Sequence, residues 1–183
     1  MRIGFSVIVC ALFFLTNQAN GKKLDWSGGY FTLSSQTPTA KSSFGNMGAF
    51  QISTRFNLYD NLEFGFGYSL TFSKFFSGDY GYGPDMGLFY FPFTSAGDTN
   101  LKDSGIHILN HDIYRPFVCV QFHTRQFQSI GASYAGFSMG GGIEYWRFHP
   151  VGIRLWAKNT QLLGPQKSTA TEFTVMGGFS WEY

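Results

Sequence analysis

Large apolar residues alternate with small or polar residues along most of this chain. In "LEFGFGYSLTF", residues 62–72, every even-numbered residue is Leu, Phe or Tyr, and every odd-numbered residue is Glu, Gly, Ser or Thr. A period of two is typical of β-strands with one apolar face and one polar face. The same pattern predicts eight strands, at residues 24–34, 44–56, 62–75, 84–93, 115–123, 134–147, 152–161 and 170–183.

Neighbouring segments are predicted to pair as hairpins, which places charged residues opposite each other. Turns centred on residues 59, 149 and 165 give three pairs of opposite charge: Arg55 with Glu63, Glu144 with Arg154, and Lys158 with Glu172. Directly opposed residues share one face of a sheet. All three pairs fall on the face that carries few aromatic residues, so the sequence predicts that this face is ion-paired.

The polar face of the strands is dominated by Gly, Ser and Thr. A soluble sandwich or lipocalin-like barrel would turn this face to water, where long charged side chains are expected. Small residues instead suit the inside of a narrow barrel, and a Phe-rich face suits lipid. Eleven residues, tilted by about 40°, span roughly 27 Å, close to the apolar band of membrane barrels. Strands in hydrocarbon need every backbone group paired, so we predict a closed antiparallel eight-stranded up-and-down transmembrane β-barrel.

Two sets of residues follow from this barrel. An interior ion-pair network is predicted, because buried charges are tolerable only when paired; it comprises Arg55, Glu63, Glu144, Arg154, Lys158, Glu172 and Glu182. Aromatic residues at the two membrane interfaces are also predicted. They include Trp26, Tyr145, Trp181 and Tyr183 at the turn end, and Phe44, Phe72, Tyr134 and Phe137 at the loop end.

Composition narrows the class of protein further. Charged residues make up 13% of the chain and aromatic residues 20%, which excludes global disorder. The net charge is +2 and basic residues form no run, so nucleic-acid binding has no electrostatic support. Residues 1–21 are predicted to be a signal peptide, because Arg2 precedes an apolar stretch that is followed by a polar segment with small residues near the cleavage site. Residues 22–183 would then form the barrel. Cys119 is then the only cysteine, which rules out an intramolecular disulfide.

The last segment, "TEFTVMGGFSWEY", alternates apolar residues and ends on an aromatic residue, Tyr183. With "YRPFVCVQF" and "GFSMGGGIEYW", it resembles the small eight-stranded outer-membrane barrels of Gram-negative bacteria, the OmpA-like family. The resemblance implies a monomeric protein of the outer membrane, in contact with lipid and lipopolysaccharide. It also implies that the barrel-assembly machinery recognises the C-terminal strand. In this family the last residue is usually Phe, whereas this chain ends on Tyr183.

The function expected from these features is structural support or surface display, with a filled interior and no large pore. The alternatives are a narrow channel for ions or small solutes, a lipid A-modifying outer-membrane enzyme, and a soluble secreted ligand-binding barrel. For an enzyme, His123 is the candidate, but no serine is adjacent to it and its strand parity places it inward. No cofactor is predicted, and no metal site, since His107 and His111 lie in a segment without helical pattern. The connection over residues 94–114 is too long for the short turn that this topology requires.

Overall fold

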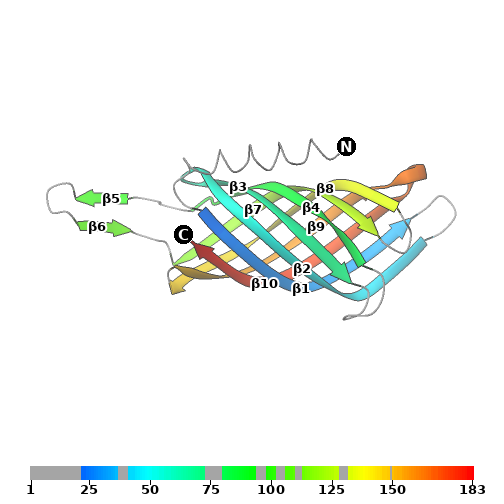
Figure 1. The fold of residues 1–183 in the computed structure, drawn as a ribbon, viewed down its shortest axis with the longest axis horizontal. Coiled ribbons are helices and arrows are strands. Elements are labelled where there is room, and N and C mark those ends of the chain that lie inside the picture. The colour runs from blue at the N-terminus through cyan, green and yellow to red at the C-terminus, as the bar shows by residue number, and fades with distance from the viewer. Residues whose placement is uncertain are drawn as a thin grey trace.

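The chain forms a closed antiparallel barrel of eight strands in the computed structural model (Figure 1), which confirms the predicted fold class. The structure describes residues 22–36, 41–72, 80–93, 98–101, 106–109, 113–127, 132–148 and 150–183. The predicted signal peptide, residues 1–21, lies outside the described residues. None of the helices in the described part of the chain has the length and hydrophobicity needed to cross a membrane.

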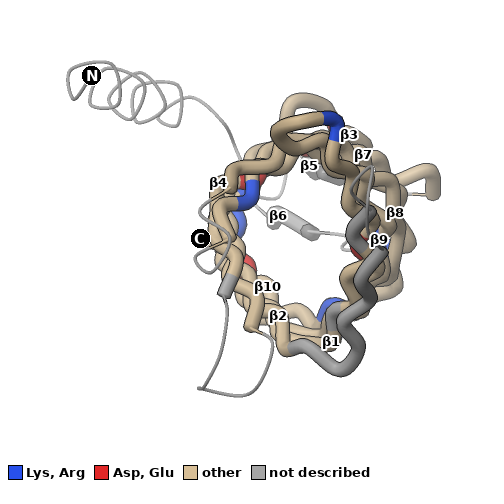
Figure 2. Tube along the Cα trace, turned by 90° about the vertical axis from the view of Figure 1, so that its right-hand side faces the viewer, with Lys and Arg blue, Asp and Glu red and all other residues tan. Residues whose placement is uncertain are grey.

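Each barrel strand overlaps one of the predicted segments, and the largest difference is at 84–93, where the strand begins and ends earlier than predicted. The barrel strands are β1 (Lys22–Gln36), β2 (Lys41–Tyr59), β3 (Leu62–Phe72), β4 (Tyr80–Tyr90), β7 (Tyr114–Phe127), β8 (Ala132–Phe148), β9 (Val151–Leu163) and β10 (Thr169–Glu182). A short 3-10 helix, η1 (Pro165–Lys167), joins β9 to β10. Each strand pairs with its neighbour in the barrel, and β1 closes the ring by pairing with β10 (Figure 2).

The long connection between β4 and β7 is explained by a separate two-stranded sheet. Strands β5 (Asp98–Leu101) and β6 (Ile106–Leu109) pair with each other, outside the barrel. Figure 1 shows them projecting from the barrel end at which β1 begins and β10 stops. The predicted count of eight barrel strands is therefore right, and the strands described within the connection form their own sheet.

The side chains are arranged as the sequence predicts for residues 62–72. Glu63, Gly65, Gly67, Ser69 and Thr71 are buried inside the barrel, whereas the even-numbered residues lie on its outer surface. The outer surface also carries large exposed residues on other strands, among them Trp26, Val118 and Leu155. The residues with the lowest exposure include charged ones, which is the reverse of an ordinary soluble core.

Several aromatic residues depart from this rule and point into the barrel. Phe89, Phe91, Phe117, Phe127 and Tyr134 are all buried, so the prediction that Tyr134 lies at a membrane interface is wrong. Glycines beside these rings make room for them. A Cβ atom on Gly65 of β3 would lie 2.6 Å from the Phe89 ring, and one on Gly164, which follows β9, would overlap the Tyr134 ring.

The registers of the predicted hairpins are correct in one case and shifted in two. Glu144 is opposite Arg154, as predicted. Arg55 is opposite Gly65 instead of Glu63, because the turn lies at Asp60 and Asn61, between the paired residues Tyr59 and Leu62, and is not centred on Tyr59. Lys158 is opposite Thr174 instead of Glu172. Both shifts amount to two residues, so each residue keeps its predicted face.

Pro84, the first residue of the predicted segment 84–93, lies within β4. It is paired with Tyr68 of β3, whereas the ladder between β4 and β7 passes from Tyr82 to Asp85 without a pair at Gly83 or Pro84. Proline has no backbone N–H to donate, so the ladder is interrupted on that side.

Candidate functional site

The interior of the barrel holds two clusters of charged residues, and they are the chemically distinctive part of the molecule. The first, the mouth cluster, lies toward the barrel end at which β1 begins and β10 ends. It comprises Lys23, Asp25, Arg55, Glu63, Arg115, Glu144 and Arg154. Six strands contribute these residues, so the cluster connects most of the circumference of the barrel.

Arg55 is the centre of the mouth cluster, because it contacts all three carboxylates. Its Nε and Nη2 atoms donate to Asp25 at 2.5 and 2.8 Å. Its Nη1 atom donates to Glu63 Oε2 at 2.6 Å, and its Nη2 atom lies 2.6 Å from Glu144 Oε1. Three carboxylates around one guanidinium would leave excess negative charge in the barrel, and the other cations of the cluster balance it.

The remaining cations hold the same carboxylates from other strands. Lys23 Nζ and Arg115 Nη2 both donate to Glu63 Oε1, at 2.5 and 3.1 Å. Arg154 Nη1 donates to Asp25 Oδ2 at 3.0 Å. Each carboxylate of the mouth cluster therefore contacts at least two cations, and loss of one contact leaves another in place.

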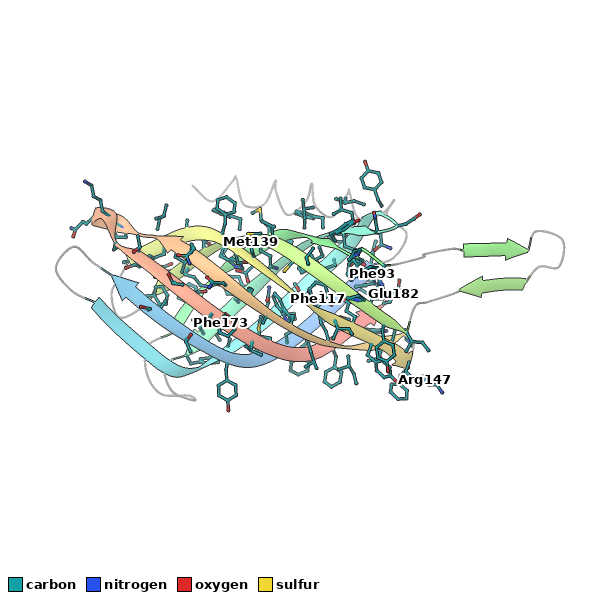
Figure 3. The ribbon with its side chains drawn as sticks, turned by 180° about the vertical axis from the view of Figure 1, so that it is seen from behind. Phe93, Phe117, Met139, Arg147, Phe173 and Glu182 are labelled. Carbon is teal, nitrogen blue, oxygen red and sulfur yellow. The ribbon has the colours of Figure 1, made fainter. Side chains whose placement is uncertain are left out.

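An aromatic layer lies beside the mouth cluster and fills the middle of the barrel. The centre of the Arg154 guanidinium lies 4.4 Å from the centre of the Phe117 ring, and 4.8 Å from the rings of Phe89 and Trp156. These distances are typical of cation–π contacts. Figure 3 labels Phe117 between the two ends of the barrel. The rings fill the interior space that small residues leave.

The second cluster, the loop-side cluster, lies on the far side of the aromatic layer. It comprises Ser69, Asp85, His123, Arg125, Ser138, Lys158 and Glu172. Asp85 is its main acceptor: Arg125 Nη1 donates to it at 2.6 Å, His123 Nδ1 lies 2.5 Å from it, and the Ser69 hydroxyl also donates to it. Glu172 is held more loosely, with Oε1 3.7 Å from Arg125 Nε.

Both ends of the barrel interior are closed by large side chains. Phe91 and Trp146 are buried at the mouth, and Trp146 Nε1 donates to Glu144 at 2.9 Å. At the loop end, the buried rings of Phe127 and Tyr134 pack edge to face with centres 5.5 Å apart. Large buried side chains thus occupy the described interior at both ends and in the middle, with one small cavity in the loop-side cluster, as expected for eight strands.

The structure places the predicted site residues as follows. It brings Arg55, Glu63, Glu144 and Arg154 together in the mouth cluster. Lys158 and Glu172 both line one small cavity in the loop-side cluster. They do not form the predicted ion pair with each other; Lys158 Nζ instead donates to Gln121 Oε1 at 3.2 Å. Glu182 is half-buried at the end of β10, opposite Lys23.

Of the predicted interface aromatics, Trp26, Trp181 and Tyr183 are exposed on the outer surface, with Tyr145 and Phe72 partly exposed. The side chain of Phe44 lies outside the described residues.

The prediction missed five of the interior charges: Lys23, Asp25, Asp85, Arg115 and Arg125. The signal for them was strand parity. Asp25 alternates with the exposed residues Leu24 and Trp26, and Asp85 alternates with Met86. Parity alone would have placed both aspartates inside the barrel.

His123 faces the interior, as its parity predicted, but it does contact a serine. Its Nε2 atom lies 2.6 Å from Ser138 Oγ, while Nδ1 contacts Asp85. Serine, histidine and aspartate occur in this order in hydrolase triads. Here Ser138 and His123 are 1% and 0% exposed, so no substrate reaches the hydroxyl in this arrangement. We interpret the three residues as a buried hydrogen-bond chain.

A closed antiparallel eight-stranded barrel, apolar outside and charged inside, has the fold of the small outer-membrane β-barrels. Solved structures agree. Neisserial surface protein A is similar over 90% of this chain and 99% of its own, with a TM-score of 0.64 and 8% identity. The N-terminal barrel domain of Pseudomonas aeruginosa OprF is similar over 90% and 98%, with a TM-score of 0.51 and 12% identity.

The Escherichia coli outer-membrane protease OmpT is also similar, over 91% of this chain and 98% of its own, with a TM-score of 0.50 and 8% identity. No protein-family model and no curated protein sequence matches this chain. Because one similar barrel is a protease, the fold by itself does not decide for or against catalysis.

Proposed function

We propose that this protein is an integral outer-membrane barrel that serves as a rigid frame for surface display, with a closed, ion-paired interior. One observation carries the proposal: the outer surface is apolar and exposed, while fully buried Arg, Lys, Asp and Glu residues fill the interior. In water, this distribution would expose a continuous apolar band, which soluble monomers avoid. In a bilayer, the same band is solvated by lipid.

The closed interior favours a frame over a channel. The aromatic layer and the large side chains at the two ends occupy most of the described interior and leave one small cavity. In this proposal, the hairpin of β5 and β6, the start of β1 and the end of β10 lie on the periplasmic side, and the loop ends of the strands face the outside of the cell. The terminal strand β10, whose following residue Tyr183 donates its N–H to Lys22 O at 3.0 Å, is the segment proposed to engage the assembly machinery.

The test is a cysteine-labelling scan of residues 62–72. The full chain, including residues 1–21, is expressed with Cys119→Ser, and single cysteines are then introduced one at a time. The protein should enter the outer-membrane fraction and migrate differently on gels before and after heating. Single cysteines at positions 64, 66 and 70 should react with a lipid-soluble maleimide, whereas cysteines at 65, 67 and 69 should not. Reaction of both sets with a water-soluble reagent, or recovery in a soluble fraction, would exclude the proposal.

A further inference from the structure

The outer surface of the barrel is not uniformly apolar. On three adjacent strands near the loop end, polar residues occupy outward positions; we call these residues the outer polar patch: Thr32, Ser34, Asn159, Gln161 and Thr171. All are exposed except Thr171, which is half-buried. At the loop ends of β3 and β4, the corresponding outward residues are Leu70, Phe72 and Tyr82. The loop ends of β7 and β8 also carry an exposed polar pair, Gln126 and Ser133. The patch therefore lies opposite β3 and β4 in the ring of strands, next to a second, smaller polar pair.

The residues of the patch are neighbours in the sheet. Gln161 pairs with Thr171, which pairs in turn with Ser34. Asn159 pairs with Phe173, which pairs in turn with Thr32. Two hydrogen bonds connect them: Thr171 Oγ1 donates to Gln161 Oε1 at 3.0 Å, and Gln161 Nε2 donates to Asn159 Oδ1 at 3.1 Å.

These two bonds use the amide oxygens and leave N–H groups without a partner among the residues that the structure describes. Both hydrogens on Asn159 Nδ2 and one on Gln161 Nε2 remain to be satisfied. At the edge of a hydrocarbon layer, an unpaired donor is costly, so these groups need acceptors. None of the five residues is charged, which favours a neutral acceptor such as a carbonyl or hydroxyl oxygen over a phosphate.

The height of the patch matches the place where lipids carry such oxygens. Thr171 and the interface residue Trp181 are about ten residues apart along β10, or roughly 26 Å along the membrane normal at a tilt of about 40°. This distance equals the thickness of the apolar band. The patch thus lies where acyl chains join their headgroup through ester and amide carbonyls.

Apolar side chains flank the patch in the positions that acyl chains would occupy. Met139 and Phe173, the sheet neighbours of Asn159, are 72% and 48% exposed, and Phe137 beside Gln161 is 63% exposed. Figure 3 labels Met139 and Phe173 on this side of the barrel. Polar donors between exposed apolar residues suit a lipid with several acyl chains and several carbonyls.

We propose that the outer polar patch binds the acyl-linkage region of lipopolysaccharide, its lipid A part, in the outer leaflet. The inference rests on the proposed function, because it requires the loop end to lie in that leaflet. Amide and ester carbonyls of lipid A accept from Asn159 and Gln161. Its acyl chains lie against Phe137, Met139 and Phe173.

The test uses the full mature chain, folded in a mild detergent and incubated with purified lipid A or with phosphatidylethanolamine. Native mass spectrometry then counts the lipids retained. The variant is N159L/Q161L, and the matched control is Gln126→Leu, which removes an exposed amide from the loop end of β7 instead. Folding of each variant is checked first by heat-modifiable gel migration, and Thr171→Val provides a milder variant if the double one does not fold.

Wild-type protein and the control should retain lipid A, and N159L/Q161L should retain about tenfold less, consistent with the loss of two hydrogen bonds. Retention of phosphatidylethanolamine should be unchanged. Equal retention of lipid A by all variants, or equal loss of both lipids, would overturn the proposal. So would a wild-type dimer that N159L/Q161L abolishes, because a second copy would then cover the patch. If one of these contrary results is obtained with a protein that is found in the outer-membrane fraction of cells, the lipid site alone is refuted. If the protein is absent from that fraction, the proposed function is refuted.

Discussion

The two charged clusters inside the barrel differ in how many partners each charge has. In the mouth cluster, Arg55 contacts three carboxylates and every carboxylate contacts at least two cations. In the loop-side cluster, three donors converge on Asp85, while Glu172 has one contact, at 3.7 Å. Charged residues are therefore buried in two different ways in one barrel. The mouth cluster shares its contacts across six strands, whereas the loop-side cluster depends on one acceptor, Asp85, beside the loosely held Glu172.

Removal of the central cation should have the largest effect. Arg55→Met leaves Asp25, Glu63 and Glu144 buried with fewer cations, and we expect the free energy of unfolding to fall by about 3–5 kcal/mol. The measurement is urea unfolding in lipid vesicles. Arg147→Met is the matched control, because Arg147 is exposed at the same end of the barrel (Figure 3), and it should change stability by less than about 0.5 kcal/mol. Equal effects of the two variants would contradict the network.

Removal of the single acceptor in the other cluster should come next. Asp85→Asn keeps the shape of the side chain but leaves Arg125 without a close counter-charge, and we expect a loss of about 2–3 kcal/mol. The control is Asp60→Asn in the exposed β2–β3 turn, which should be nearly neutral. A loss larger than that of Arg55→Met would reverse the order of the two clusters.

The aromatic layer that separates the clusters can be tested through the glycine beside it. A methyl group at Gly65 would lie 2.6 Å from the Phe89 ring, so Gly65→Ala should cost about 1–3 kcal/mol by overpacking. At Gly28 the nearest atom to such a methyl group is 3.8 Å away, so Gly28→Ala should be tolerated. Similar unfolding curves for both variants would show that the layer can shift to accept the added atom.

The smallest effect is expected at the loosely held carboxylate. Glu172→Gln removes a charge that accepts no hydrogen bond in the structure, and we expect a change of less than about 1 kcal/mol, of either sign. Glu63→Gln is the matching variant in the mouth cluster. Because Glu63 accepts hydrogen bonds from Lys23, Arg55 and Arg115, this substitution should lower the free energy of unfolding clearly more. If Glu172→Gln cost as much as Glu63→Gln, the proposed contrast between the clusters would be lost.

The sequence predicted most of the architecture because strand parity is a local property. Alternation over residues 62–72 assigned the inner and outer faces correctly, and a register error of two residues at Arg55 did not alter those faces. Parity also predicted that His123 points inward. It could not predict that Ser138 and Asp85 come from two other strands to contact His123.

The amino-acid sequence by itself determined that this chain forms strands with one apolar face and one face of small or charged residues. It also determined that eight such strands close into a barrel. Only the tertiary structure decided which charges meet. Tilt and stagger bring Asp25 to Arg55 and Arg154, although its neighbours in the ladder are Ser53 and Ser180. Long flexible side chains reach across the barrel between strands that are distant in sequence, and a pattern with a period of two carries no information about that distance.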